Sequence, residues 1–202
     1  MNIYPIKITG TLCEGKMVSI GWPNSTEFDK ITNLRNKPNV RKHFLDNRVL
    51  DTLQNRKWLD SGMKRPKEAL LSIRFKANGC FLGTIGWSDW DVDMKTAWFV
   101  RLMIDHDMMN DIKPLLPKQY IGIAIDASMA LRDFAMTKME IGFLRTYLFI
   151  NNTRAMKVNA IIGLEVIGKA TRQLIDGTTV DTIEMLLTKA MWQNNNQQVQ
   201  RG

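Results

Sequence analysis

Two apolar runs in the middle of the chain constrain the fold most strongly, because a tight turn joins them. Leu70 to Lys76 and Cys80 to Trp87 read as strands, and Ala77-Asn78-Gly79 between them ends in two residues that accept positive φ. Thr96 to Ile104 is a third run of this kind and follows an acidic loop, Ser88 to Met94. We therefore predict a three-stranded antiparallel meander at the centre of the fold.

Helical and extended patterns follow one another on both sides of this meander. Residues 1–24 are predicted to be extended, with a strand at Met17–Ile20. The predicted helices run from a cap at Ser25 or Thr26 to Pro38, and over Thr52–Ser61, Gly122–Thr137 and Thr153–Ile162. Further predicted strands are Leu144–Ile150, Glu165–Ile175 and Val180–Thr188, and Asp105–Lys118 is predicted to be a long loop. This mixed order predicts an α/β (α+β) fold, with helices on both faces of a mixed central sheet.

Length and composition fit one compact domain. With 202 residues and 45% hydrophobic content, the chain can bury a core without disulfides or a metal. We expect one domain over residues 1–192 and a disordered polar tail, rich in Asn and Gln, over residues 193–202. The spacing of Cys13 and Cys80 suits neither a zinc site nor a disulfide framework, so we expect no metal and a reducing compartment. Apolar runs fall short of the roughly 20 residues of a membrane helix, which predicts a cytoplasmic protein without a membrane span.

The net charge of +8 favours a polyanionic partner. A nucleic acid, a nucleotide-bearing cofactor and an acidic surface are all compatible with it, and so is a simply solvated surface. The basic residues are spread along the chain, and it contains no motif typical of a nucleic-acid reader. We therefore expect no nucleic-acid partner.

The motif with the clearest chemistry is Gln119-Tyr120-Ile121-Gly122-Ile123-Ala124, at the start of the predicted helix Gly122–Thr137. Free backbone N–H groups and the positive end of the helix dipole make such a start a phosphate site. Gly122 allows a phosphate to approach the backbone closely, and Gln119 can add a side-chain donor. The pattern alone is weak, since a glycine at a helix start is often only a turn residue.

The order of motifs resembles that of the GNAT acetyltransferase superfamily. Gln119 to Ala124 is similar to its [QR]-x-x-G-x-[GA] pyrophosphate motif, which follows a β-meander. Asn152-Thr153-Arg154-Ala155, with Gly163 eleven residues after Asn152, resembles the signature of the next strand–helix unit. The closing segment from Gly163 to Leu187 resembles the RimJ/RimL-like branch, so the likeness covers about residues 96–190.

This resemblance implies direct acetyl transfer from acetyl-CoA to a primary amine. Gln119 to Ala124 would hold the pyrophosphate, and Asn152 and Ala155 would adjoin the pantetheine arm. A bulge in the preceding strand would supply the backbone N–H that binds the oxyanion, with Leu102, Met103 and Ile104 as candidates. A homodimer is compatible with the resemblance.

The proton chemistry departs from the pattern. Many members of the superfamily have a Tyr where Asn159 stands, and the RimL-like branch has a Ser where Ala155 stands. That leaves His106 with Asp105 as the predicted base, acting through water, and Tyr120 or Tyr147 as alternatives.

The front half is similar to GNAT enzymes that acetylate amino groups of nucleotide-activated sugars. The resemblance rests on the stretch from Asn33 to Lys42 and on Arg56-Lys57-Trp58-Leu59. Arg35, Asn36 and Arg41 are therefore candidates for binding an anionic acceptor. The predicted acceptor is an aminosugar nucleotide or a related small amine. A protein N-terminus is the alternative acceptor, and a non-catalytic acyl-CoA-binding module is the alternative function.

Overall fold

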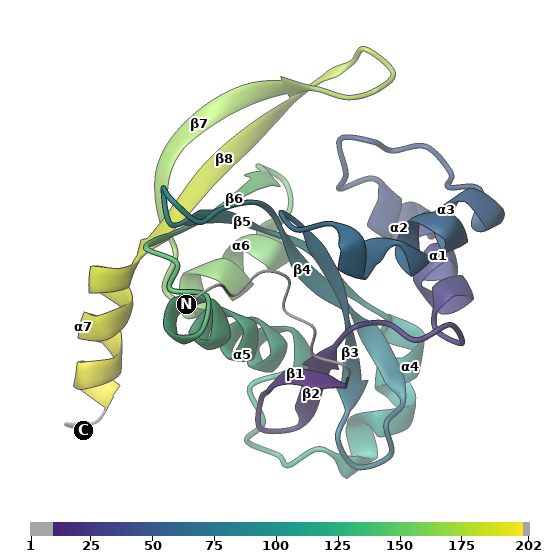
Figure 1. The fold of residues 1–202 in the computed structure, drawn as a ribbon, viewed down its shortest axis with the longest axis horizontal. Helices are drawn as coiled ribbons and strands as arrows, with labels where there is room; N and C mark the ends of the chain where they lie inside the picture. Colours follow the sequence, from purple (N-terminus) through teal and green to yellow (C-terminus); the bar gives the residue numbers. More distant parts are fainter. Residues whose placement is uncertain (1–9, 200–202) are drawn as a thin grey trace.

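The computed structural model describes residues 10–199, which contain an eight-stranded sheet (Figure 1). In chain order the strands are β1 (Thr11–Glu14), β2 (Val18–Gly21), β3 (Ala69–Phe75), β4 (Phe81–Asp91), β5 (Thr96–Ile104), β6 (Phe143–Phe149), β7 (Glu165–Gln173) and β8 (Thr179–Thr188). Across the sheet the order is β1-β2-β3-β4-β5-β6-β8-β7. Only the β5–β6 pair is parallel among the described strands. The predicted meander is confirmed as β3-β4-β5.

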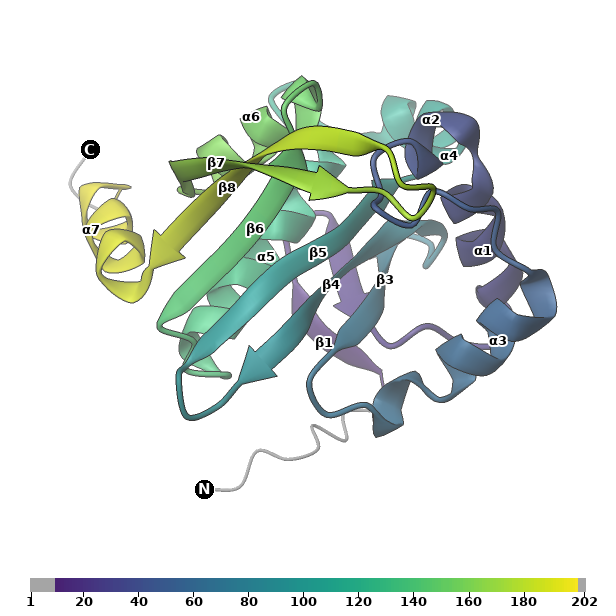
Figure 2. The same ribbon diagram turned by 90° about the horizontal axis from the view of Figure 1, so that it is seen from above.

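Helices cover both faces of this sheet (Figures 1 and 2). They are α1 (Phe28–Asn36), α2 (Pro38–Arg41), α3 (Thr52–Asp60), α4 (His106–Ile112), α5 (Ile123–Thr137), α6 (Thr153–Ile161) and α7 (Lys189–Val199), with short 3₁₀ turns at Gly62–Lys64 and Lys113–Leu115. Neighbouring side chains of a strand point to opposite faces, so Leu70 packs with α1 and α3 while Leu71 packs with α5. The predicted mixed sheet with helices on both faces is confirmed.

Three local predictions differ from the structure. The predicted loop after β5 contains α4, because Asp105 accepts a hydrogen bond from the Asp107 N–H and Ile112 is buried. Helix α1 begins at Phe28 without a side-chain cap, since Thr26 bonds to Asn24 instead.

The third difference is at the carboxyl end, where a disordered tail is predicted from Gln193 but α7 continues to Val199. Met191 and Trp192 pack its first turns on the core, and the Trp192 indole donates to Asp133 at 2.7 Å. The predictions for residues 1–9 and 200–202 lie outside the described residues.

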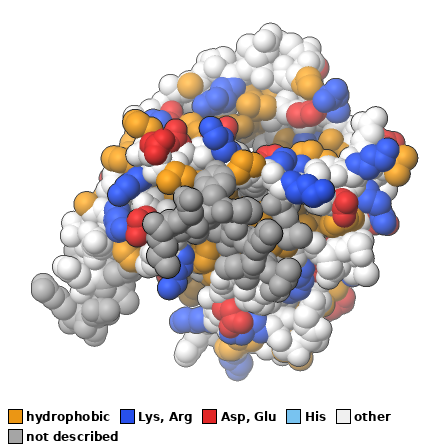
Figure 3. All heavy atoms as spheres, viewed as in Figure 1, with side chains coloured by type: hydrophobic (Ala, Val, Ile, Leu, Met, Phe, Trp, Pro, Cys, Tyr) orange, Lys and Arg blue, Asp and Glu red, His pale blue; other side chains and the backbone are white. Residues whose placement is uncertain are grey.

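Positively and negatively charged side chains are interspersed on the described surface. On the face in Figure 3, Lys and Arg side chains are scattered among acidic and apolar ones. Cys13 and Cys80 are free thiols. Within residues 10–199, no helix is long and apolar enough to cross a membrane, and no group of three or more His, Cys, Asp or Glu side chains is arranged to hold a metal ion.

Candidate active site

Strands β5 and β6 separate after a short parallel stretch. Their register runs from Thr96 opposite Phe143 to Trp98 opposite Arg145 and records no further pairs within the two described strands. A side-chain bond then bridges the gap, because the Thr146 hydroxyl donates to the Phe99 carbonyl at 2.8 Å. The diverging halves leave backbone groups that need other partners. The gap between them is the first component of the candidate site.

A β-bulge in β5 stands at this point of divergence. Gly86 pairs with Val100 and Thr84 pairs with Met103, so Arg101 and Leu102 together oppose the single residue between Thr84 and Gly86. Arg101 has φ +64°, and the buried Thr84 hydroxyl donates to its carbonyl at 2.8 Å. The bulge therefore turns part of the strand backbone away from the ladder and toward the gap.

A cavity of about 270 Å³, here called the cleft pocket, fills the gap between β5 and β6. Its walls include His43, Arg101, Leu102, Tyr147, Asn152 and Ala155. Three of the sequence-predicted residues, Leu102, Asn152 and Ala155, are thus brought together. Asn159 also lines this pocket, and its amide donates to the Ala155 carbonyl at 2.9 Å.

Two helices begin near the wide end of the gap. Helix α6 starts directly after β6, with the Asn152 side chain accepting from the Ala155 N–H at 3.3 Å. The chain leaving α5 is fixed at the narrow end, since the Gly142 N–H donates to the Lys95 carbonyl just before β5. The 15-residue helix α5 spans about 22 Å, so its amino end points toward the wide end.

Gly122 caps the start of α5 with φ +100° and ψ 147°, a conformation that favours glycine. A Cβ added there would meet no atom within 4 Å, so the space beside the helix start is open. The N–H groups of Ile123 and Ala124 have no acceptor within the helix. Ile121 is 43% exposed. The predicted helix start with a permissive glycine is confirmed.

Asp126 fixes this helix start against β1 and β2. Its buried carboxylate accepts from the backbone N–H groups of Lys16 and Met17, at 2.7 and 2.8 Å, and from the Tyr120 hydroxyl at 2.8 Å. Burial, together with the bond to Asp126, raises the pKa of Tyr120. Tyr120 is therefore a neutral anchor for the loop that leads into α5.

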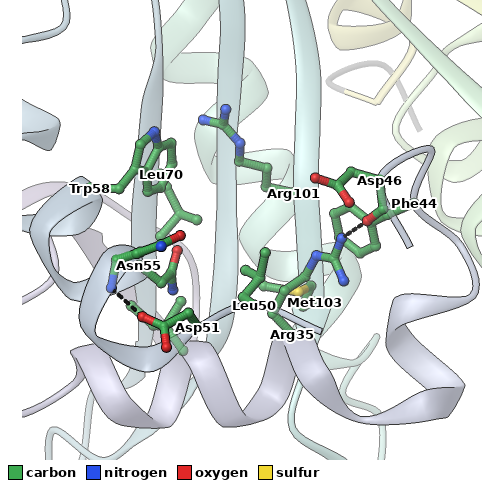
Figure 4. Close-up of a pocket in the computed structure, with 12 residues that line it drawn as sticks. Arg35, Phe44, Asp46, Leu50, Asp51, Asn55, Trp58, Leu70, Arg101 and Met103 are labelled. Atoms are coloured by element: carbon green, nitrogen blue, oxygen red, sulfur yellow. Dashed lines mark hydrogen bonds between the residues drawn. The ribbon is translucent and has the colours of Figure 1, made fainter. Parts of the chain in front are cut away.

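A second cavity, of about 480 Å³, lies between α1, α3 and the sheet and is called the α1–α3 pocket (Figure 4). Its walls include Arg35, Phe44, Asp51, Trp58, Arg101 and Met103. Arg101 and Phe44 line both pockets. The two cavities therefore meet at the bulge of β5.

Arg35 is the most constrained polar side chain of the α1–α3 pocket. It is 7% exposed, its guanidinium lies 3.9 Å from the centroid of the Phe44 ring, and one nitrogen donates to the Asp46 carbonyl (Figure 4). Its other terminal nitrogen, Nη1, is buried without a hydrogen-bond partner in the described part of the chain. Burial lowers the pKa of Arg35, while the Asp46 carboxylate opposes that shift. An arginine keeps its charge under such conditions, so a cationic donor is left unsatisfied.

The carboxylates of the α1–α3 pocket already have partners. Asp46 pairs with Arg48 at 2.9 Å, and the Arg48 guanidinium holds the pKa of Asp46 below its usual value. Asp51 caps α3 by accepting from the Gln54 N–H at 2.8 Å. Arg35 therefore has a guanidinium nitrogen without a partner among the described residues, whereas Asp46 and Asp51 are both paired.

Other sequence-predicted residues lie elsewhere. The Asn36 amide holds the backbone of Leu50 through two hydrogen bonds, at 2.7 and 3.0 Å, and Arg41 lines neither pocket. Ile104 pairs with Gly83 in the ladder. Gln119 lines neither of these two pockets and lies in the loop before α5.

Asp105 and His106 also lie outside both pocket linings. Asp105 accepts from the Lys37 ammonium at 2.8 Å, and this ion pair joins the α1–α2 corner to the end of β5. His106 is exposed at the start of α4. The catalytic role of this pair stays a prediction from the sequence.

Sequence reasoning missed His43, Phe44, Arg101 and Trp58 as pocket residues. The first two belong to an irregular loop, and Arg101 is turned into the pockets by the bulge, which periodicity does not reveal. His43 had one usable signal, since the chain has only two histidines.

By sequence, the chain matches no family model and no curated protein. By structure it is similar to a spermidine N-acetyltransferase from Vibrio cholerae in complex with CoA and spermine, with a TM-score of 0.73, 13% identity and coverage of 87% of this chain and 98% of that chain.

FdhC, a nucleotide-linked sugar GNAT, gives a TM-score of 0.71 at 12% identity, over 96% of this chain and 98% of its own. The microcin C7 self-immunity acetyltransferase MccE, in complex with acetyl-CoA and AMP, gives 0.68 at 15% identity, over 86% and 93%. The RimJ/RimL-like branch stays a prediction. The mixed sheet, split between β5 and β6 and covered by helices on both faces, is the fold of the GNAT acetyltransferases.

Proposed function

We propose that this protein transfers an acetyl group directly from acetyl-CoA to a primary amine. One observation carries the proposal: the cavity between β5 and β6 and the cavity under α1 and α3 share Arg101 and Phe44, beside the bulge of β5. A donor held in one cavity and an acceptor held in the other would present their reacting atoms to each other there. Such positioning contributes a large part of the rate in bimolecular transfers.

The cleft pocket suits the pantetheine arm of acetyl-CoA. Its amides can pair with the unpaired backbone edges of β5 and β6, as an added strand pairs with a sheet. The pyrophosphate would then lie at the amino end of α5, on the N–H groups of Ile123 and Ala124 beside Gly122. Gln119, Tyr120 and Ile121 form the loop that leads to this position, and Asn152 and Ala155 line the arm's path.

The bulge supplies the donor for the reaction itself. Attack on the thioester carbonyl places negative charge on its oxygen, which a fixed backbone N–H stabilises. Leu102 is the strongest of the three candidates, because it lines the cleft pocket and has no paired residue in β4, whereas Met103 and Ile104 are paired.

The α1–α3 pocket suits an amine that also carries an acidic group. A phosphate or carboxylate of the acceptor would face the guanidinium of Arg35, which lines this pocket. Trp58 and Phe44 add apolar walls for a ring or a base. An aminosugar nucleotide combines an amine, a sugar ring and phosphates, and it is therefore our proposed acceptor. A polyamine lacks the acidic group that Arg35 calls for.

Free-thiol release from acetyl-CoA tests this proposal with three acceptors: an aminosugar nucleotide, spermidine and a peptide with a free amino terminus. We expect the largest kcat/KM with the aminosugar nucleotide. A preference for the peptide would favour the N-terminal acetyltransferase alternative. Binding of acetyl-CoA without turnover of any acceptor would favour a non-catalytic acyl-CoA-binding module.

The variant Arg35→Gln refines the same assay. We expect KM for the acidic acceptor to rise at least tenfold, while kcat/KM for an amine without an acidic group changes less than threefold. Arg56→Gln is the matched control, because it removes the same charge from an exposed ion pair with Asp29. Equal losses for both acceptor classes would mean that Arg35 only supports the fold.

A further inference from the structure

His43 occupies the cleft pocket although it lies far from the pocket's other residues in the sequence. It belongs to the loop between α2 and α3 and shares the pocket with Leu102 of the bulge and with Asn152. Its ring meets Phe149 of β6 edge-on, with 6.5 Å between the centroids. Its Nδ1 atom is buried and has no hydrogen-bond partner within residues 10–199. The His43 residue lines the pocket beside the bulge, so a molecule bound there would lie next to this side chain.

Contacts from both sides hold the loop that carries His43. The N–H groups of His43 and Phe44 donate to the carbonyls of Val40 and Arg41 at 3.1 Å. The tip of the β7–β8 hairpin, which reaches this loop in Figures 1 and 2, donates from the Ile175 N–H to the Leu45 carbonyl at 3.0 Å. The Asn47 amide also donates to Asp176 at 3.2 Å. These contacts fix the backbone of the loop that carries the imidazole.

Electrostatics keep this imidazole neutral. Burial lowers the pKa of His43, and the positive charge of Lys42 lowers it further. The other titratable side chains of the pocket are Arg101 of β5 and Tyr147 of β6. Burial raises the pKa of Tyr147, so it stays a neutral phenol at physiological pH. His43 is thus in its neutral, proton-accepting form, and neither Arg101 nor Tyr147 carries a negative charge that would stabilise the imidazolium.

We propose that His43 is the general base of the acetyl transfer, the role for which the sequence offers His106 and Asp105. The assignment rests on the proposed function. As the amine nitrogen forms its bond to the thioester carbonyl carbon, His43 accepts the N–H proton that the nitrogen must lose. The tetrahedral intermediate then collapses, the C–S bond breaks, and the imidazolium returns the proton to the leaving thiolate. The products are the acetylated amine and CoA thiol, so no other reactant is needed.

The two histidines differ in their surroundings. His106 is exposed and follows Asp105, which is already bound to Lys37. His43 lies in the same cavity as the bulge that would bind the oxyanion. A base must come within hydrogen-bond reach of the proton, directly or through one water, and only His43 shares a cavity with the proposed reacting centre.

Steady-state kinetics of His43→Gln and His106→Gln test the assignment. We expect kcat of His43→Gln to fall about 100-fold or more, in line with the loss of a general base, with KM for acetyl-CoA within threefold of the parent value. A loss below threefold would overturn the proposal, as would a loss confined to His106→Gln. A His43→Gln protein that no longer binds acetyl-CoA would show that His43 acts in binding instead.

The pH profile gives a second readout that a merely structural role would not move. The acid limb of kcat/KM should lie below the usual histidine pKa of about 6.5 and should disappear in His43→Gln. Lys42→Gln should shift this limb to higher pH, because removing a nearby positive charge makes the imidazolium easier to form. An acid limb that stays in place in both variants would contradict the assignment.

Nuclear magnetic resonance separates failure of this inference from failure of the proposed function. The imidazole signal of His43, assigned by its absence in His43→Gln, should shift when CoA is added. An unchanged signal in protein that binds CoA would refute His43 as the base and leave acetyl transfer intact. Protein that shows no CoA binding at all would refute the proposed function, and the base assignment with it.

Discussion

At the residue scale, the backbone conformation of Gly122 is what the proposed cofactor site depends on. Its positive φ sets the direction in which the chain enters α5, and an added Cβ would meet no described atom within 4 Å. A side chain there would stand where the proposed pyrophosphate lies. Asp126, buried behind it, fixes the helix start through three hydrogen bonds, so this position is set before any ligand arrives.

Gly122→Val tests this position. We expect acetyl-CoA affinity, measured by titration calorimetry, to fall at least tenfold, because the side chain would displace a phosphate. Gly79→Val is a matched control: Gly79 also has positive φ and open space, but it lies in the β3–β4 turn. Both variants should lose about 1–3 kcal/mol of stability, because each places a β-branched side chain in a backbone conformation that favours glycine. Equal acetyl-CoA affinity in the two variants would remove Gly122 from the cofactor site.

At the element scale, the bulge of β5 joins the two cavities. Phe99 and Leu102 both pack on the α5 side, which simple alternation along a strand forbids for residues three apart. The extra residue of the bulge allows Phe99 and Leu102 to lie on the same face, and it places the Arg101 side chain in the lining of both pockets. The hydroxyl of the fully buried Thr84 donates a hydrogen bond to the Arg101 carbonyl.

Thr84→Val keeps the shape of this side chain but removes its hydrogen bond to the bulge. We expect a loss of about 1–3 kcal/mol of stability, because the Arg101 carbonyl is left without its partner. If the bulge positions the reacting carbonyl, kcat should fall at least tenfold while KM for acetyl-CoA changes less than threefold. Denaturant unfolding and steady-state kinetics measure the two effects. Loss of stability with an unchanged kcat would separate the bulge from the reaction.

The predictable elements were those whose signal is local. The Asn78-Gly79 turn, the apolar runs around it and the helix starting at Gly122 follow from turn chemistry and periodicity, and the structure has them close to the expected bounds. Helix α4 was hidden by Pro114, which lies just beyond the helix in a 3₁₀ turn, and α7 was hidden by its polar composition. Local composition does not report the tertiary contacts of Ile112 and Trp192 that stabilise these two helices.

The residues of the candidate site also differ in whether a local sequence signal predicts them. Leu102, Asn152 and Ala155 follow strand and helix ends that a motif can locate, and they do meet in one pocket. His43 reaches that pocket through a loop whose path depends on the β7–β8 hairpin, more than a hundred residues later in the sequence. No local pattern specifies such a contact, so adjacency in the sequence favoured His106 beside Asp105.

At the scale of the whole molecule, the sheet separates two tasks. Helices α5 and α6 begin near the wide end of the β5–β6 gap, where a diphosphate would meet two positive helix ends. Helices α1 and α3 cover the opposite face and enclose the pocket that contains Arg35. The two pockets share Arg101 and Phe44, so in the proposed function donor and acceptor would meet at the bulge.

The melting temperature of the protein with and without acetyl-CoA tests the central claim most directly. A ligand at 100 times its dissociation constant stabilises the folded state by about 2.7 kcal/mol, and a chain of this size gains roughly 2–4 °C per kcal/mol. We therefore expect millimolar acetyl-CoA to raise the melting temperature by about 5–10 °C. An unchanged melting temperature at millimolar acetyl-CoA would contradict the account.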